Sequence, residues 1–342
     1  MPCTCLSLFL LTDTSMNKRL HFQPLIAMMT VCLTFALFTA CSSDSDEEGQ
    51  GGGGAGVVNV NKNDTSKEPA LSRLEFPKVK GGDSRVLIHS NNDQIGINFS
   101  VEWDTKKQSQ RWTCYQITAA NRKKETSRYY PQSGELQYPF DPKLGTSLYF
   151  NGNDPYWNSG YDHGLICPSA DRLYSRDANI QTFYLTNMQP QKNVFNAGVW
   201  SHMEEFMREK IGTQAGDTLF ICKGGTIDKA DQIIRTLSNG LIVPKYFFMA
   251  ALRKKSKDWS NVGAMGFYIE HLTYDGYKRN AAGNKYDLGA YTVSIRELEQ
   301  LTGIDFFCNL PDDIEELVET KSVDFIKDVW GPMVAPKQTI SN

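Results

Sequence analysis

Two neighbouring segments of the chain carry residue types that could form a catalytic site. The first, SGYDHGLICPSADR at residues 159–172, places a histidine among acidic and small residues, and histidine is the commonest general acid or base. In the second segment, Asn196, Trp200, Glu204 and Arg208 are spaced four apart, so a helix would place them on one stripe. An amide, an acid and a guanidinium are unusual on a core-facing surface. The alternative is an i,i+4 salt bridge on a solvated face, which the spacing taken alone favours.

Together the two segments resemble the DNA/RNA non-specific endonuclease family, the ββα-metal nucleases that carry a DRGH motif. The matching residues are YD-x-G-x-ICPSADR, then N-x-x-PQ, then FN-x-G-x-W-x-x-x-E and Arg208. The similarity continues in VSIRELEQLTGIDFF and LPDDIEEL, and covers about residues 95–320. This resemblance implies an α+β, ββα-metal (His-Me finger) nuclease fold, with a central, mainly antiparallel sheet flanked by helices.

The resemblance also implies roles for residues at the matching positions. Asn196 corresponds to the protein ligand of a catalytic Mg²⁺, which Mn²⁺ could replace, and Glu204 to a residue that holds a metal-bound water. Arg208 corresponds to an arginine that binds the scissile phosphate, and Arg128 is a candidate for a second phosphate contact.

Three further residues would support this centre. Asp162 fits a residue that supports the motif without binding the metal itself. Asn187 and Gln191 resemble residues that orient the metal-binding helix, although solvated turn residues are an equally good interpretation of both.

The chain departs from the family motif at the catalytic base. In the family, the last residue of DRGH is the histidine that takes a proton from the attacking water, whereas this chain has DHGL at residues 162–165. Leu165 has no lone pair, and loss of a general base predicts a rate lower by about 10²–10⁴-fold. A bound metal could still lower the pKa of a water molecule and sustain residual activity.

His163 is a candidate substitute for the missing base. It lies two residues from Leu165, and residues two apart in an extended backbone face the same side. The interpretation that the sequence favours is that His163 only replaces the arginine of the family motif in a tolerant loop.

We therefore predict a Mg²⁺-dependent endonuclease that hydrolyses phosphodiester bonds of DNA and RNA without sequence preference, impaired by Leu165. The alternative is a pseudonuclease, a surface lipoprotein that binds metal or nucleic acid without efficient cleavage. A weaker third possibility is a phosphodiesterase for a smaller substrate. The sequence makes no prediction of the oligomeric state.

The N-terminal residues resemble an export signal. Lys18 and Arg19 precede the apolar run LIAMMTVCLTFALFTA, and the run ends at Cys41 in a sequence, FTAC, that resembles a lipobox. Residues 1–40 are thus predicted to be a signal peptide with Met16 as its true start, and Cys41 to be the lipid-modified residue that anchors the protein to a membrane. A transmembrane anchor is the alternative.

The residues after Cys41 predict a tether and one domain. Residues 41–82 begin with SSDSDEE and continue with a glycine-rich stretch, which predicts an acidic, flexible tether. The endonuclease-like domain is predicted at residues 83–335. An exported lipoprotein of the outer membrane is the expected form, and the acidic tether points to the cell surface.

Composition excludes a general attraction to polyanions. The 342 residues have a net charge of -3, and beyond residue 48 there are 34 basic against 34 acidic residues. Nucleic-acid binding would therefore need a local basic patch. The four cysteines after Cys41 have no CxxC spacing, which argues against a zinc site and leaves free thiols or disulfides open.

Hydrophobic patterning predicts the elements that must position these residues. We predict strands in residues 86–90, 96–104, 111–118, 181–188, 217–222, 243–254 and 264–272, and helices in residues 196–210, 294–303 and 310–320.

Overall fold

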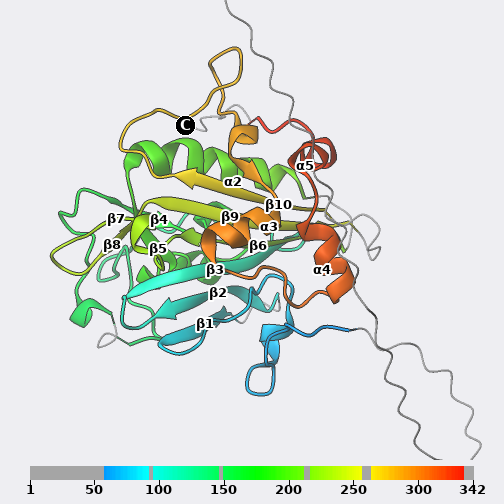
Figure 1. The fold of residues 1–342 in the computed structure, drawn as a ribbon. Coiled ribbons are helices and arrows are strands. Elements are labelled where there is room, and N and C mark those ends of the chain that lie inside the picture. The colour runs from blue at the N-terminus through cyan, green and yellow to red at the C-terminus, as the bar shows by residue number, and fades with distance from the viewer. Residues whose placement is uncertain (1–57, 92–94, 146–148, 212–215, 256–262, 335–342) are drawn as a thin grey trace, which may run out of the picture. The chain divides into compact units, whose positions relative to one another are not determined.

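A twisted antiparallel sheet forms the centre of the fold in the computed structural model, which describes residues 58–91, 95–145, 149–211, 216–255 and 263–334. Its strand order is β1-β2-β3-β6-β9-β10-β11, and each pair of neighbouring strands is antiparallel (Figure 1). The strands are β1 (Ser84–Ser90), β2 (Ile97–Asp104), β3 (Ser109–Thr118), β6 (Thr218–Gly225), β9 (Tyr246–Lys254), β10 (Gly263–Glu270) and β11 (Thr292–Val293). The predicted α+β class with a mainly antiparallel sheet is confirmed.

Both faces of this sheet are covered, because side chains alternate along each strand and both sets are apolar. On β3, Tyr115 and Ile117 enter one hydrophobic cluster, whereas Trp112 and Cys114 enter a second cluster on the opposite face. Helices complete each cluster, so the fold has three layers.

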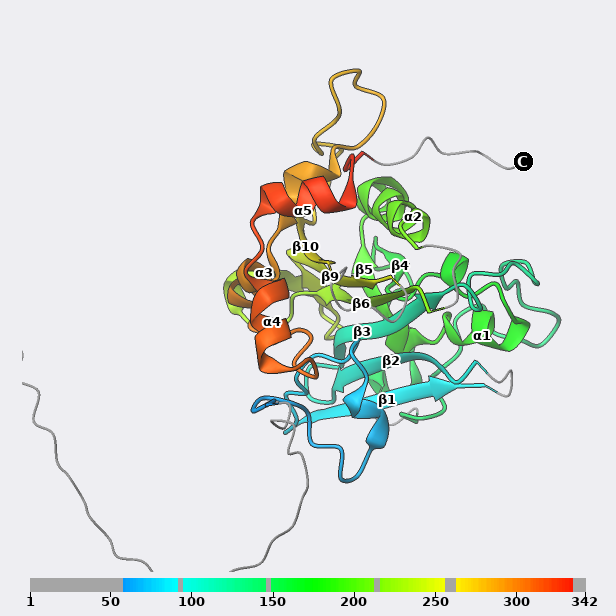
Figure 2. The same cartoon turned by 90° about the vertical axis from the view of Figure 1, so that its right-hand side faces the viewer.

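The helices divide between the two faces. Figure 2 shows α3 and α4 on one side of the sheet and α1 and α2 on the other. Leu298 of α3 and Val318 of α4 pack in the second cluster, while Met203 and Phe206 of α2 pack in the first. The helices are α1 (Arg176–Gln181), α2 (Ser201–Glu209), α3 (Ile295–Thr302), α4 (Asp312–Glu319) and α5 (Val323–Trp330).

The helix predicted at residues 294–303 is present as α3, and Ser294 caps its start. The Ser294 side chain accepts a hydrogen bond of 3.1 Å from the Glu297 amide, and the helix ends at Gly303 in the left-handed conformation.

A small ββα unit lies beside the main sheet. It consists of the hairpin-like pair β4 (Asp162–Leu165) and β5 (Met188–Gln191), followed by a π-helical turn (Phe195–Trp200) that leads into α2. A third small sheet pairs β7 (Ile233–Thr236) with β8 (Ile242–Pro244). Because β4 carries the DHGL segment and α2 carries Glu204 and Arg208, this unit brings the two predicted segments together.

The folded domain begins earlier than the predicted boundary at residue 82. Phe76 is fully buried in the second hydrophobic cluster, and Asn63 is buried with its amide donating a hydrogen bond of 3.0 Å to the Pro77 carbonyl. The polar composition of residues 58–82 suggested a tether, but their asparagine side chains satisfy backbone groups and hold the segment on the domain. Residues 1–57, including Cys41, lie outside the described residues.

The predicted strand at residues 181–188 is wrong for most of its length. This stretch contains the end of α1 and a 3-10 turn at Leu185–Asn187, and only Met188 belongs to a strand. Its aromatic and β-branched residues are typical of a strand, but in the structure they are buried within turns.

The four cysteines of the described residues are free and buried, so none forms a disulfide: Cys114, Cys167, Cys222 and Cys308.

Candidate active site

A cavity of about 260 Å³ opens on the ββα unit, between β4 and the start of α2. Six of the residues predicted from the sequence line it: Arg128, His163, Leu165, Asn196, Glu204 and Arg208. The structure therefore gathers residues that are up to 80 positions apart in the chain. We call this cavity the ββα cleft.

The helix that presents Asn196 begins with a π-helical turn, and this changes the predicted stripe. The turn spans Phe195–Trp200, with Gly198 at non-helical angles (φ -99°, ψ -119°). A π turn holds more residues than an α turn, so Asn196 shares its face with Ser201 rather than with Trp200. Trp200 is 1% exposed and packs against the Phe195 ring, so its predicted place on the stripe is wrong.

Asp162 fixes the orientation of the Asn196 amide. The Asn196 Nδ2 donates a hydrogen bond of 3.1 Å to Asp162 Oδ2, and the same oxygen accepts one of 3.0 Å from Asn193 Nδ2. Asn196 lines the cleft, and because its nitrogen is used in this way its Oδ1 atom, to which no described residue donates, is left for a ligand. An oriented carbonyl oxygen is a ligand suited to a hard cation.

Glu204 is held by a lysine from the main sheet. Its carboxylate lies 2.5 Å from the Nζ atom of Lys223, and the lysine side chain is completely buried. Burial raises the pKa of Glu204, and the nearby charges of Lys223 and Arg208 oppose that rise. Lys223 therefore helps to keep a carboxylate charged at the base of the cleft.

Arg208 is positioned by the last acid of the ICPSADR segment. Its Nη1 atom lies 2.9 Å from Asp171 Oδ1, and Asp171 also accepts a hydrogen bond of 3.0 Å from the Tyr115 hydroxyl. One guanidinium nitrogen is thereby fixed, while 24% of the side chain stays exposed at the cleft. This arrangement leaves a partly exposed cation able to pair with a phosphate.

Arg128 reaches the cleft from the loop that precedes β4. The residue is exposed, and its guanidinium carbon lies 4.8 Å from the centre of the Phe183 ring. Ring stacking restrains the guanidinium and leaves its hydrogen-bond donors free for an anion.

Two large aromatic side chains lie exposed in the same loop region. Tyr130 is 70% exposed and lies two residues after Arg128, while Trp157 is 78% exposed. The Ser159 amide donates a hydrogen bond of 2.9 Å to the Tyr156 carbonyl, which makes Trp157 and Asn158 the central residues of a tight turn.

On β4, His163 and Leu165 point to the same face and both line the cleft, as the strand period predicts. Leu165 packs partly against the main hydrophobic cluster. The His163 Nε2 atom lies 2.9 Å and 3.2 Å from the two carboxylate oxygens of Asp154. Its ring stacks on Tyr138, with ring centres 3.6 Å apart, and lies 4.6 Å from the Tyr156 ring.

Asn187 and Gln191 are both completely buried, which excludes the solvated-turn interpretation of these residues. The Asn187 amide donates hydrogen bonds to the carbonyls of Cys167 and Thr182, and its oxygen accepts one of 2.9 Å from the Cys167 amide. It thus ties the end of β4 to the start of β5.

Gln191 holds β4 by packing rather than by hydrogen bonds within the described residues. Its side chain lies against Gly164, where an added Cβ would come within 2.4 Å of the Gln191 Cδ atom. The DHGL segment therefore requires a glycine at this position because the two strands approach so closely.

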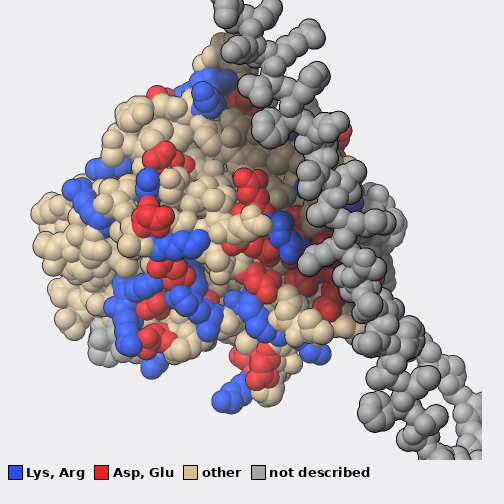
Figure 3. Space-filling view, in the orientation of Figure 1, with Lys and Arg blue, Asp and Glu red and all other residues tan. Residues whose placement is uncertain are grey.

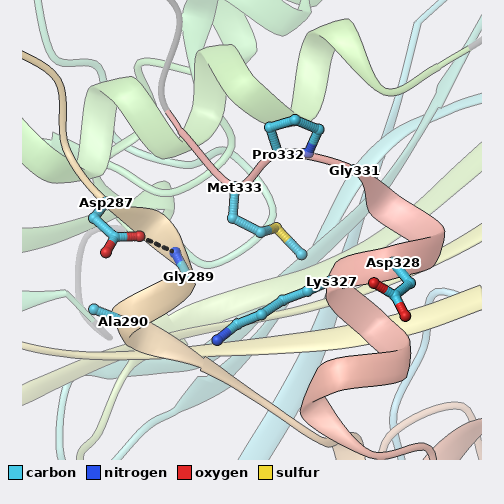
Figure 4. A pocket seen from close by; sticks show the side chains of 8 residues that line it. All are labelled: Asp287, Gly289, Ala290, Lys327, Asp328, Gly331, Pro332 and Met333. Atoms are coloured by element: carbon cyan, nitrogen blue, oxygen red, sulfur yellow. Dashed lines mark hydrogen bonds between the residues drawn. The ribbon is translucent and has the colours of Figure 1, made fainter. Parts of the chain in front are cut away.

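Two other features of the surface lie apart from these residues. A hollow of about 550 Å³ lies beside α5, and Figure 4 shows the Lys327 amine extending across it toward Ala290, but none of the predicted site residues lines it. On the face in Figure 3, acidic side chains gather over α3 and α4, where carboxylates of Glu299, Asp305 and Glu319 lie within 4.8 Å of one another.

Within the described part of the chain, no helix is long and apolar enough to cross a membrane.

Sequence reasoning missed the residues that hold the site in place, which are Lys223, Asp171 and Asp154. Lys223 stands within the strand LFICKGG, and a lysine in an apolar strand is a signal that could have been used. Asp171 lies inside the quoted motif ICPSADR, but no role was predicted for it. Asp154 gave no signal, because its partnership with His163 arises only in the folded loop.

Comparison with known proteins finds similarity to one family of nucleases. The sequence profile of the DNA/RNA non-specific endonuclease family matches residues 87–313. A nuclease from Nostoc sp. is 27% identical over 262 residues, which is 75% of this chain and 88% of that protein. The mitochondrial nuclease EXOG of Mus musculus is 24% identical over 275 residues, or 78% of this chain and 67% of that protein.

A solved structure supports the fold itself. A chain in the crystal structure of the EndoG/EndoGI complex superposes with a TM-score of 0.52 at 18% identity, covering 71% of this chain and 94% of that chain.

Proposed function

Because this chain belongs to the DNA/RNA non-specific endonuclease family, we propose that it hydrolyses phosphodiester bonds of DNA and RNA with the help of Mg²⁺. The observation that carries the proposal is the meeting of Asn196, Glu204 and two arginines in the ββα cleft. An oriented carbonyl oxygen, a carboxylate and two phosphate-binding cations are together the groups that metal-assisted phosphodiester hydrolysis requires.

The donor atoms of the cleft fit a hard divalent cation. The Asn196 Oδ1 atom is fixed by the bond to Asp162 and would be the direct ligand, and Glu204 would hold a metal-bound water. Mg²⁺ keeps several waters and takes few protein oxygens, and Mn²⁺ would substitute for it. The bound metal would supply Lewis-acid stabilisation of the phosphate and lower the pKa of a coordinated water.

The remaining residues would bind and orient the substrate. Arg208, held by Asp171, and Arg128, held over Phe183, would pair with the phosphate on which negative charge develops. Contacts of this kind read the backbone rather than the bases, which supports cleavage without sequence preference.

Leu165 would make the enzyme slow. It occupies the position of the family's general base, and its side chain neither donates nor accepts a proton. A general base contributes about 10²–10⁴-fold, so a residue with a lone pair at this position would raise the rate by at most about that factor.

Digestion of plasmid DNA and of RNA by the purified chain tests this function. We expect slow cleavage with Mg²⁺ or Mn²⁺, none in EDTA, none for Asn196→Ala, and faster cleavage by Leu165→His, by at most about 10²–10⁴-fold. Asp275→Asn, which removes an exposed carboxylate paired with Arg279, is a control that should leave the rate unchanged. Folded wild type and folded Leu165→His that are both inert would overturn the proposal.

Leu165 also favours a second candidate, a pseudonuclease that binds metal and nucleic acid without efficient cleavage. This candidate predicts that Mn²⁺ and oligonucleotides bind to the wild-type chain, measured by calorimetry and by fluorescence anisotropy. Cleavage would stay at background in wild type, and Leu165→His would restore it.

We further propose that the protein is exported and anchored through a lipid at Cys41, in the outer membrane and facing the cell surface. The lipobox-like sequence FTAC and the acidic tether support this proposal. Radiolabelled fatty acid should label the wild-type chain and not Cys41→Ser. Equal labelling of the two chains would contradict it.

A further inference from the structure

We propose that His163, oriented by Asp154, is the general base of the ββα cleft and that it performs the proton transfer for which Leu165 is unfit. The inference rests on the proposed function of the cleft as a site of phosphodiester hydrolysis. It identifies the origin of the residual activity and adds Asp154, Tyr138 and Tyr156 to the residues on which that activity depends.

The position of His163 is compatible with this role. It lies on the same face of β4 as Leu165, two residues away, and it lines the same cavity as Asn196. Residues two apart in a strand are separated by about 6.6 Å, so the base would be displaced along β4 without leaving the cleft.

The contacts of His163 define which nitrogen could act as the base. Its Nε2 atom faces the Asp154 carboxylate at 2.9 Å, and hydrogen bonds from His163 and the Tyr156 amide hold the pKa of Asp154 below its usual value although burial opposes this. A charged carboxylate can only accept a hydrogen bond, so Nε2 carries the proton and donates it. In the neutral ring the lone pair therefore lies on Nδ1.

The Nδ1 atom is available to the cleft. It makes no hydrogen bond to a described residue and is not buried away from solvent. The two tyrosine rings clamp the imidazole, with Tyr138 nearly parallel to it at an interplanar angle of 9°. A carboxylate on one nitrogen and an open second nitrogen is the arrangement by which a histidine is oriented as a base.

The groups that face His163 do not compete for this role. Burial raises the pKa of both Tyr138 and Tyr156, which keeps the two rings neutral. Arg128 is a cation at the cleft, and the Asp162 carboxylate is already bonded to Asn196. The arginine of the family motif could not act as a base here, because a guanidinium stays protonated.

The proposed step is a balanced hydrolysis. The His163 Nδ1 atom takes one proton from a water molecule, whose oxygen forms a bond to phosphorus. The bond between phosphorus and the leaving ester oxygen breaks, and that oxygen takes a proton from solvent. The imidazolium then returns its proton to solvent, which regenerates the neutral ring.

The first test uses the metal-free protein and requires no activity. The ¹⁵N chemical shifts of the His163 ring, in the range where it is neutral, should report a proton on Nε2 and none on Nδ1. Asp154→Asn should shift the ring toward the other tautomer, whereas the control Asp275→Asn should not. A His163 ring that carries its proton on Nδ1 in wild type would overturn the proposal.

The second test compares rates in two backgrounds. In the wild-type background, His163→Ala should lower the rate by at least about tenfold, and added imidazole should restore part of it. In the Leu165→His background, where a base is present again, His163→Ala should change the rate by less than about threefold. A purely structural role would cost the same in both backgrounds and would not respond to imidazole.

The outcomes separate this inference from the function it rests on. If Leu165→His cleaves but His163→Ala leaves the wild-type rate unchanged, the nuclease function stands and the role of His163 is refuted. If no variant cleaves although all fold and bind Mn²⁺, the proposed function itself fails.

Discussion

Replacing Lys223 by methionine should destabilise the protein, because it leaves the Glu204 carboxylate in a buried position without its cation. The Lys223 side chain is 0% exposed and that of Glu204 is 10% exposed, so solvent hardly screens the pair. Breaking such a pair by removing one partner costs about 3–5 kcal/mol. Arg208 also lowers the pKa of Glu204 and remains in place, so we expect the lower end of this range.

Urea unfolding of the metal-free protein, followed by circular dichroism, measures this effect. At about 2 °C per kcal/mol for a large domain, the melting temperature should also fall by roughly 6 °C. The double variant Lys223→Met with Glu204→Gln removes the orphaned charge, so it should recover most of the lost stability. A double variant as unstable as Lys223→Met would refute the electrostatic explanation and point to lost packing instead.

The same variant carries a pH signature. Loss of Lys223 raises the pKa of Glu204 further above the unfolded value of 4.5. A group whose pKa is raised in the folded state loses stabilising free energy as the pH rises from the unfolded pKa to the folded one. The deficit of Lys223→Met relative to wild type should therefore be larger at about pH 8 than at about pH 5. An equal deficit at both pH values would contradict a charged Glu204.

Three further predictions follow from other observations. Trp157→Ala should weaken the binding of single-stranded oligonucleotides by roughly 5–100-fold without lowering the melting temperature, because stacking on an exposed ring contributes about 1–3 kcal/mol per base. Fluorescence anisotropy of an oligonucleotide titrated with wild type or with the variant measures this. Gly164→Ala should cost about 1–3 kcal/mol in urea unfolding, because the new Cβ would overlap the Gln191 side chain. Burial raises the pKa values of Glu299 and Glu319, and the charge of Glu319 adds to the rise at Glu299. Stability should therefore fall as pH rises above about 4.5, and Glu299→Gln should flatten that fall in calorimetry.

Local signals in the sequence predicted the parts of the fold that are stabilised locally. The helix α3 was predicted at residues 294–303, and Ser294 and Gly303 cap it within its own sequence. Burial of a strand on both faces gives continuous apolar runs, which is why β2, β3, β9 and β10 were also recognised. The resemblance to a nuclease family placed Asn196, Glu204 and Arg208 near one another, and the ββα cleft contains all three.

The sequence could not predict features that depend on distant partners or on a change of helical period. The π-helical turn was missed because the spacing of Asn196 and Trp200 was interpreted with 3.6 residues per turn. Residues 58–82 look like a linker because asparagine is typical of loops, yet the Asn59 amide donates hydrogen bonds to the carbonyls of Cys308 and Leu310, which are distant in the chain. Pairing of Asp154 with His163 depends on the conformation of an irregular loop that no periodic pattern encodes.

The retention of the metal-side and phosphate-side residues does not by itself argue for activity, because several of them also stabilise the fold. Arg208 is tied to the buried Asp171, and Glu204 is tied to the buried Lys223, so either residue could persist for stability alone. Asn196 is different. It is partly exposed, and the one hydrogen bond that its side chain makes among the described residues is to Asp162, so replacing the side chain would cost the fold little. A polar side chain that is held in place, turned toward a cleft and of little use to stability is best explained by a ligand, and Asn196 is therefore the residue on which the case for metal binding depends most.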